Sequence, residues 1–262
     1  MSDFDPSVLL EGVRDAVLEA GSIIARNVRL PKAIRKKGDN DLVTETDVAV
    51  EELLKRRLAV LLPGSRFLAE ESASGTRLAD RTWIIDPLDG TTNFAHGLPF
   101  VATSVALWHR GGPLLGVVNL PLLGELFTAL RGRGARCNGE PIQVSETEEL
   151  SQSLVATGFP YDIPTYLPEI LKNLEKMLPN TRGVRRPGAA ALDLAYVACG
   201  RYDGFYESAL QPWDTAAGLL LVEEAGGRIT RYDQAQPYTP GDASLLASNG
   251  RIHDQMSALL VG

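Results

Sequence analysis

The sequence predicts an α+β protein made of two packed subdomains. Two helical segments come first, short apolar strands separated by Gly and Pro follow, and strands alternate with helices after about residue 150. The period of the apolar pattern distinguishes these regions, because it is 3.6 residues in a helix and two in a strand. The pattern predicts an antiparallel sheet with helices in the first half and an α/β layer in the second.

In the first half, an amphipathic helix is expected over residues 7–27 and another over 46–62. Between them, the polar segment KKGDND predicts a loop that carries lysines at 36–40. Strands are expected at 66–71, 83–86, 100–109, 114–119 and 125–130, with turns at Gly111-Gly112, Leu123-Gly124, Asn138-Gly139 and in RGRGARC (131–137).

In the second half, strands are expected at 153–157, 203–207, 228–232 and 244–248, and helices at 164–178, 189–199, 214–225 and 252–260. The change from consecutive strands to strands that alternate with helices places a boundary within 145–152. This boundary divides the chain into residues 1–148 and 149–262. No linker rich in Pro or Gly separates the halves, so we expect them to pack as one unit.

Composition excludes several classes of function. The 262 residues include 26 Lys and Arg against 33 Asp and Glu, a net charge of −7, which disfavours binding to nucleic acid or to an anionic membrane. There is no apolar run of the roughly 18 residues that a membrane span needs. The acidic N-terminus lacks a signal-peptide pattern, and two cysteines are too few for a disulfide framework. We therefore expect a cytoplasmic protein.

The segment WIIDPLDGTTNF (83–94) is the strongest candidate for chemistry. Asp86 and Asp89 lie three residues apart, so two carboxylates on one turn could share a cation. Gly90 permits a tight turn, and the amides that follow could face an anion at a helix N-terminus. Taken alone, the segment is more typical of an Asx turn that only ends a strand, and only the other acids of the chain favour chemistry.

Other acids also lie at the ends of apolar elements: Asp47, Glu70-Glu71 and Asp214. Each alone could be a helix N-terminal charge or a solvated strand end. If they meet Asp86 and Asp89, two carboxylates about 4 Å apart repel by roughly 4 kcal/mol, so the cluster needs protons or cations. Oxygen ligands select Mg²⁺, or Mn²⁺ or Ca²⁺ as substitutes, and favour phosphoryl transfer to water. His96, His109 and His253 share no ligand spacing, and no P-loop or G-x-S-x-G motif is present.

Asp47, Glu70-Glu71, DPLDGTT (86–92) and WDTAAG (213–218), in this order and spacing, resemble the inositol monophosphatase family of lithium-sensitive, magnesium-dependent phosphatases. The resemblance covers nearly the whole chain, and RRPGAAALDLAYVACGRYDGFYE is most similar to bacterial inositol-1-monophosphatases. It implies a layered α-β-α-β-α sugar-phosphatase fold, like that of fructose-1,6-bisphosphatase, and a homodimer.

The resemblance also implies a metal site of two to three Mg²⁺ ions. Glu70, Asp86 and the Leu88 carbonyl are expected around the first ion. Asp86, Asp89 and Asp214 are expected around the second, and Glu70 holds a third through water. Most of these ligands belong to residues 1–148, whereas Asp214 belongs to 149–262.

For the substrate, the resemblance implies that Thr91, paired with Asp47, orients the attacking water together with Glu70. The amides of Gly90 and Thr91 are expected to face the phosphate. Asp89, Ala190 and Glu207 match positions that contact sugar hydroxyls, and the loop at 36–40 matches a mobile segment. Ala189, where relatives commonly have Ser or Thr, and Pro187 depart from the family pattern and put the substrate contacts in doubt.

The expected reaction is hydrolysis of an inositol monophosphate. Alternative substrates are fructose 1,6-bisphosphate, 3′-phosphoadenosine phosphate, NADP and histidinol phosphate. Glu207 favours a hydroxyl-rich leaving group, whereas Arg185 and Arg186 could bind a second phosphate or form a surface or dimer salt bridge. A different class of function is an interaction protein with a secondary phosphatase site, although the sequence contains no partner motif.

Overall fold

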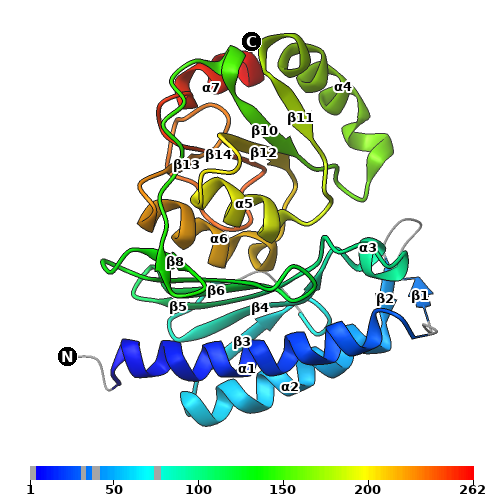
Figure 1. Cartoon of the computed structure of the whole chain (residues 1–262), viewed down its shortest axis with the longest axis vertical. Coiled ribbons are helices and arrows are strands. Elements are labelled where there is room, and N and C mark those ends of the chain that lie inside the picture. The colour runs from blue at the N-terminus through cyan, green and yellow to red at the C-terminus, as the bar shows by residue number, and fades with distance from the viewer. Residues whose placement is uncertain (1–3, 31–33, 37–41, 74–77) are drawn as a thin grey trace.

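The computed structural model describes residues 4–30, 34–36, 42–73 and 78–262, which form five layers (Figure 1). From one side to the other, these are a helix pair, a sheet, a second helix pair, a second sheet and a third helix pair. The α+β class and the layered α-β-α-β-α architecture are therefore confirmed. The helices are α1 (Pro6–Asn27), α2 (Glu45–Leu61), α3 (Thr91–Ala95), α4 (Ile163–Asn180), α5 (Ala190–Ala198), α6 (Pro212–Glu224) and α7 (His253–Val261), with a 3₁₀ turn at Leu150–Gln152.

The first sheet has seven strands in the order β3-β4-β5-β6-β7-β8-β9. It is antiparallel except for the β3–β4 pair, which is parallel. Helices α1 and α2 cover its outer face, and α6 packs on its inner face. Its strands are β3 (Arg66–Ala69), β4 (Thr82–Asp89), β5 (Ala102–His109), β6 (Gly112–Leu120), β7 (Glu125–Leu130), β8 (Ala135–Cys137) and β9 (Glu140–Pro141).

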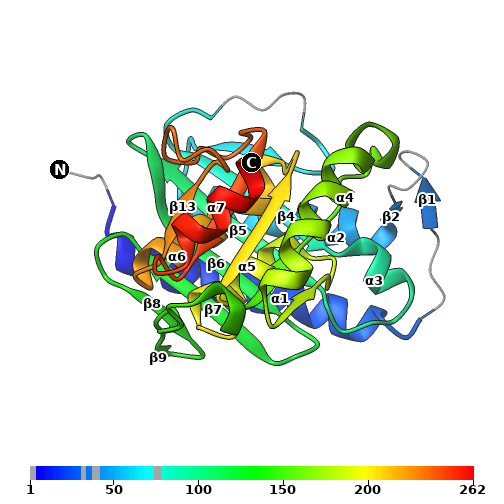
Figure 2. The same cartoon turned by 90° about the horizontal axis from the view of Figure 1, so that it is seen from above.

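The second sheet has five strands in the order β11-β10-β12-β14-β13. The β10–β11 and β10–β12 pairs are parallel, and the other two pairs are antiparallel. Helices α4 and α7 lie side by side beyond its outer face (Figures 1 and 2). Its strands are β10 (Leu154–Thr157), β11 (Gly183–Arg185), β12 (Gly204–Ser208), β13 (Arg228–Thr230) and β14 (Ser244–Ser248); a separate pair comprises β1 (Ile34–Lys36) and β2 (Leu42–Thr44).

Three local predictions need correction. Strand β4 continues through Pro87 to Asp89, because a register shift against β5 after Asp86 accommodates the proline. The β5–β6 turn is centred on Arg110 and Gly111, which both have positive φ, and Gly112 already belongs to β6. Strand β11 was not expected, because its three residues show no alternation. The expected lysine loop begins at the end of β1, but residues 37–41 lie outside the described residues.

Small residues of α6 bring this helix close to the layers on both sides. A Cβ on Gly116 of β6 would lie 2.9 Å from the Ala217 carbonyl oxygen, and a Cβ on Gly218 would lie 2.5 Å from Leu194 of α5. Close packing at Ala217 and Gly218 thus holds the middle of α6 against the first sheet on one side and α5 on the other. Because α5 and α6 share one core with both sheets, the expected division into 1–148 and 149–262 stays a prediction.

Both cysteines are free thiols in the described structure. Among the described helices, none has the combination of length and apolar character that crossing a bilayer demands.

His253 is a buried structural residue in the second half of the fold. Thr230 Oγ1 donates to the Arg231 carbonyl and therefore accepts from His253 Nε2 at 2.8 Å. Ser248 Oγ accepts from the Gly250 amide and lies 2.8 Å from His253 Nδ1, to which it can donate. The neutral ring with its proton on Nε2 satisfies both contacts. Burial, followed by the nearby Arg228 charge, lowers the pKa of His253 to about 4.

This arrangement predicts a specific loss of stability in acid. Between pH 6.5 and about 4 the unfolded chain binds a proton at His253 that the folded chain does not, so the free energy of unfolding falls as pH falls. The loss approaches about 3 kcal/mol by pH 4. Urea unfolding of the native chain and of His253→Gln at several pH values measures it. The difference in stability between them should change over this interval, and parallel curves would contradict the assignment.

Candidate active site

Strand β4 delivers Asp86 and Asp89 to the inner side of the first sheet. The Leu88 amide donates to Asp86 Oδ1 at 3.0 Å, so this segment forms the Asx turn that is typical of its sequence. Gly90 follows with φ of +84°, and a Cβ there would lie 2.7 Å from the Phe100 carbonyl oxygen. Glycine is thus required both by conformation and by space, and it allows the chain to turn directly into α3.

Thr91 and Asp47 form a buried pair between α3 and α2. Thr91 Oγ1 lies 2.9 Å from Asp47 Oδ1 and 3.0 Å from the Leu88 carbonyl oxygen. Asp47 Oδ2 accepts from the amide of Thr44 at 2.9 Å and from its hydroxyl, which completes a capping box at the start of α2. Asp47 therefore has both the structural role of a helix cap and a direct contact with the candidate site.

Glu70 lies beside Asp86 because β3 and β4 are parallel. The register pairs Ala69 with Ile85, and the Glu70 amide donates to the Ile85 carbonyl at 3.2 Å, which extends the pairing by one residue. The next residue is held from α2, where buried Glu51 accepts from the Glu71 amide at 2.8 Å. Glu51 was not anticipated, since an acid within a helix is typical of a solvated surface.

Asp214 comes from the start of α6, on the opposite side of the cleft. Its carboxylate accepts from the Gln211 amide at 2.7 Å, which caps the helix. The neighbouring Trp213 carbonyl lies 3.3 Å from Ser104 Oγ, and Ser104 pairs with Asp86 across β4 and β5. This contact brings Asp214 close to Asp86, although 128 positions separate them in the sequence.

The charges of neighbouring acids raise the pKa values of Asp86 and Asp214. Burial raises the pKa of Asp86 well above its ordinary value, and the charges of Glu70, Asp89 and Asp214 raise it further. Burial and the Asp89 charge raise the pKa of Asp214 in the same direction. Burial also raises the pKa of Asp89 to about 6. Without a cation, the folded chain thus has like charges confined together.

Glu70, Asp86, Asp89 and Asp214 line one cleft of about 640 Å³, together with Leu88, Gly90 and Thr91. Within the described ranges, no three Asp, Glu, His or Cys side chains are arranged as a ready metal cage. The cleft is lined by carboxylate and carbonyl oxygens, and these acids provide no nitrogen or sulfur ligand. Such a lining fits Mg²⁺. This ion binds through one or two carboxylates and completes its shell with water and substrate oxygens.

Asp89 also accepts a hydrogen bond from the start of α5. Its Oδ2 accepts from the Ala191 amide at 2.7 Å, and the amides of Ala190 and Gly90 oppose the rise in its pKa. Ala189 is the N-cap of α5 and provides no side-chain hydrogen bond, so the Asp89 carboxylate satisfies this helix end instead. The missing hydroxyl at position 189 therefore leaves the local fold intact.

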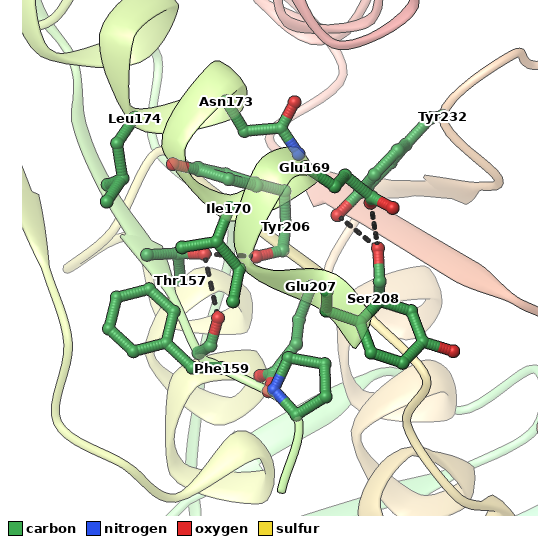
Figure 3. A pocket seen from close by; sticks show the side chains of 13 residues that line it. Thr157, Phe159, Glu169, Ile170, Asn173, Leu174, Tyr206, Glu207, Ser208 and Tyr232 are labelled. Carbon is green, nitrogen blue, oxygen red and sulfur yellow. Dashed lines mark hydrogen bonds between the residues drawn. The ribbon is translucent and has the colours of Figure 1, made fainter. Parts of the chain in front are cut away.

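Glu207 lies near the end of β12 and lines the same cleft as Thr91. It is buried, which raises its pKa to about 8. A Cβ on Gly158 would lie 2.0 Å from the Glu207 carboxylate, so any side chain at position 158 would displace that carboxylate. Behind β12, Ser208 donates to Glu169 of α4 and lies 3.2 Å from Tyr232 Oη, which anchors the strand end (Figure 3). Gly158 and Glu169 carried no recognisable signal in the sequence.

The match to known proteins agrees with this geometry. Residues 5–261 match the inositol monophosphatase family. The chain belongs to this family. An inositol-1-monophosphatase of Synechocystis is 43% identical over 98% of this chain and 91% of its own. The Nus factor SuhB of Escherichia coli K12 is 41% identical over 93% of this chain and 92% of its own. A solved inositol monophosphatase from Anabaena superimposes with a TM-score of 0.88 at 40% identity, covering 97% of this chain and 96% of that one.

The match to the inositol monophosphatase family includes the segments that carry the acids of both halves. The match extends from α1 to α7, so it covers all five layers of the fold rather than one motif. The identity of this chain as a phosphatase family member thus rests on its whole length.

Proposed function

We propose that this chain is a magnesium-dependent phosphate-monoester hydrolase that converts an inositol monophosphate and water to inositol and phosphate. The single observation that carries the proposal is the cleft lined by Glu70, Asp86, Asp89 and Asp214, in which burial and the charges of the other three acids raise the pKa of Asp86. The relatives named inositol-1-monophosphatase support the substrate class.

Bound Mg²⁺ would neutralise the acids, polarise the phosphate and stabilise the leaving alkoxide. Glu70, Asp86 and the Leu88 carbonyl would hold one ion, and Asp86, Asp89 and Asp214 a second. A third ion could be held by Glu70 through water. Mn²⁺ or Ca²⁺ could substitute in the same oxygen-rich site.

The side chains of the cleft have distinct tasks in this proposal. The Thr91 hydroxyl proton points to Asp47 or the Leu88 carbonyl, so its lone pairs remain available to accept from the attacking water. Glu70 orients the same water, and the amides of Gly90 and Thr91 face the phosphate. Asp89, Ala190 and Glu207 bind the hydroxyls of the leaving group. We propose a cytoplasmic, lithium-sensitive homodimer on the basis of family resemblance.

A second candidate function is interaction with a protein partner, with phosphatase activity secondary. The name Nus factor of the Escherichia coli relative favours this alternative. A chromosomal Asp89→Asn variant distinguishes the two, because an interaction role would survive the loss of hydrolysis.

The test of the proposed function is release of phosphate from inositol 1-phosphate by the purified chain, with Mg²⁺ or with a chelator. We expect turnover only with the metal. Equal rates under both conditions would refute the metal-dependent reaction, and absence of turnover with Mg²⁺ would refute the substrate. A panel of fructose 1,6-bisphosphate, 3′-phosphoadenosine phosphate, NADP and histidinol phosphate ranks the alternative substrates.

A further inference from the structure

Helix α2 carries a second buried acid one helical turn after Asp47. This acid is Glu51, and the spacing places both side chains on the same face of the helix. Asp47 contacts Thr91, whereas Glu51 reaches the turn that carries Glu70. Thr91 and Glu70 are the side chains that orient the attacking water in the proposed reaction. One face of α2 therefore contacts the segments that carry both of them.

Two hydrogen bonds hold the backbone on either side of Glu70. Its own amide donates to the Ile85 carbonyl at 3.2 Å, and the next amide, that of Glu71, donates to Glu51 Oε2 at 2.8 Å. Because each peptide unit is planar, holding the units before and after Glu70 restricts both of its backbone dihedrals. The direction in which its side chain leaves the backbone is then set as well. The first bond extends the β3–β4 pairing, whereas the second comes from the side chain of Glu51.

Lys55 holds the Glu51 carboxylate in place. Its ammonium donates to Glu51 Oε1 at 2.8 Å and also to the Ser72 hydroxyl. The Ser72 amide in turn donates to the Ala69 carbonyl at 3.2 Å, which closes the turn that contains Glu70. The ion pair spans positions i and i+4 of α2 with the glutamate first, the order that stabilises a helix. Lys55 thus compensates the charge of a buried carboxylate and joins it to the end of the same turn.

We infer that Glu51 is a positioning residue for the metal site, which acts through the Glu71 amide on the orientation of Glu70. The inference rests on the proposed function, because it takes Glu70 to be a ligand of the divalent cation. Removing an outer hydrogen-bond partner of a ligand typically weakens metal binding or activity by roughly 10- to 100-fold. Glu51 itself does not line the cleft that the described residues form, so its effect on the metal must pass through the turn.

Two double variants separate the hydrogen bond of Glu51 from its ion pair. The acceptor-retaining variant, Glu51→Gln with Lys55→Met, keeps an oxygen that can accept from the Glu71 amide. The acceptor-free variant, Glu51→Met with Lys55→Met, keeps the volume without a strong acceptor. Both lack the ion pair, and replacing such a pair by apolar groups of similar volume is often neutral for stability. Glu52 is the next residue of α2 and is exposed, so Glu52→Met is the control for a lost acid on this helix.

The experiment is binding of Mn²⁺, followed by the electron paramagnetic resonance signal of the free ion, which requires no turnover. We expect the acceptor-retaining variant to bind Mn²⁺ as the native chain does, and the acceptor-free variant to bind it about 10-fold more weakly or worse. When Glu70→Ala is added to each, the two should bind Mn²⁺ equally, because the residue through which Glu51 acts has been removed. Glu52→Met should bind Mn²⁺ as the native chain does.

Four results would overturn the inference: equal Mn²⁺ affinity of the two double variants, a difference between them that persists with Glu70→Ala, an acceptor-free variant that does not fold, or no Mn²⁺ binding to the native chain. Thermal unfolding in chelator accompanies the binding, because a purely structural role lowers the melting temperature of the acceptor-free variant and leaves its Mn²⁺ affinity unchanged. Hydrolysis of inositol 1-phosphate in Mg²⁺ reports separately on the proposed function. If Mn²⁺ binding follows the expected order but the native chain releases no phosphate, the proposed reaction is wrong and the positioning role of Glu51 remains.

Discussion

Asp89→Asn is expected to lower kcat for inositol 1-phosphate by about 10³-fold or more, the scale of a metal-site contribution of several kcal/mol. The substitution removes one negative charge from the cleft shared with Asp86 and Asp214. Asparagine retains an oxygen that can accept from the Ala191 amide, so the start of α5 should be preserved. Steady-state assays at saturating Mg²⁺ measure the effect.

The stability of the same variant provides the control. Like charges confined in the cleft destabilise the folded state, so Asp89→Asn in chelator should unfold at the same temperature as the native chain or higher. Added Mg²⁺ should raise the melting temperature of the native chain and raise that of the variant less. Asp254→Asn, whose side chain is 80% exposed outside the cleft, should behave as the native chain does. A variant that is inactive because it is unfolded would contradict this account.

Asp47→Asn is expected to reduce both activity and stability. Its two oxygens accept from Thr91 and from Thr44 in a fully buried position, and an amide group can replace only one of these acceptors. The free energy of unfolding should fall by about 1–3 kcal/mol, the cost of an unsatisfied buried group. Activity should fall by about 10²-fold or more, because Thr91 would no longer be held to orient the attacking water.

Two single substitutions separate these effects. Thr91→Val removes the hydroxyl that faces Asp47 and should reproduce the loss of activity while the capping box of α2 remains. Thr44→Ala removes the cap and should cost about 1 kcal/mol of stability, with activity largely retained. If Thr91→Val retained full activity, the proposed role of the Thr91 and Asp47 pair would be wrong.

The sequence predicted the elements of the fold well where periodicity or turn chemistry was strong. Helix α1 lies close to its expected range because its buried residues recur at helical spacing, and strands β5 to β7 lie close to theirs because they are apolar runs separated by Gly and Pro. Strand β11 and the continuation of β4 through Pro87 were missed, because they depend on neighbouring strands and on a register shift. Such tertiary requirements leave no local pattern.

The candidate site shows why structural and catalytic interpretations need not exclude each other. Asp86 forms an Asx turn, Asp47 forms a capping box and Asp214 caps α6, as the local interpretation of each acid suggested. The same carboxylates nevertheless lie in or beside one cleft. Their meeting depends on the parallel β3–β4 register and on the packing of α6 against β5 and β6. Gly158 and Glu51 could not be recognised, because their importance comes only from the residues that fold against them.

The central claim is that four acids distant in the sequence form one site for hard divalent cations. Anomalous diffraction from crystals soaked in Mn²⁺ tests it directly, because Mn²⁺ scatters anomalously and suits the same oxygen ligands as Mg²⁺. We expect peaks within contact of Asp86 and of Glu70, Asp89 or Asp214. Fully formed crystals of the native chain with no peak in this cleft, or with Mn²⁺ bound only elsewhere, would contradict the claim.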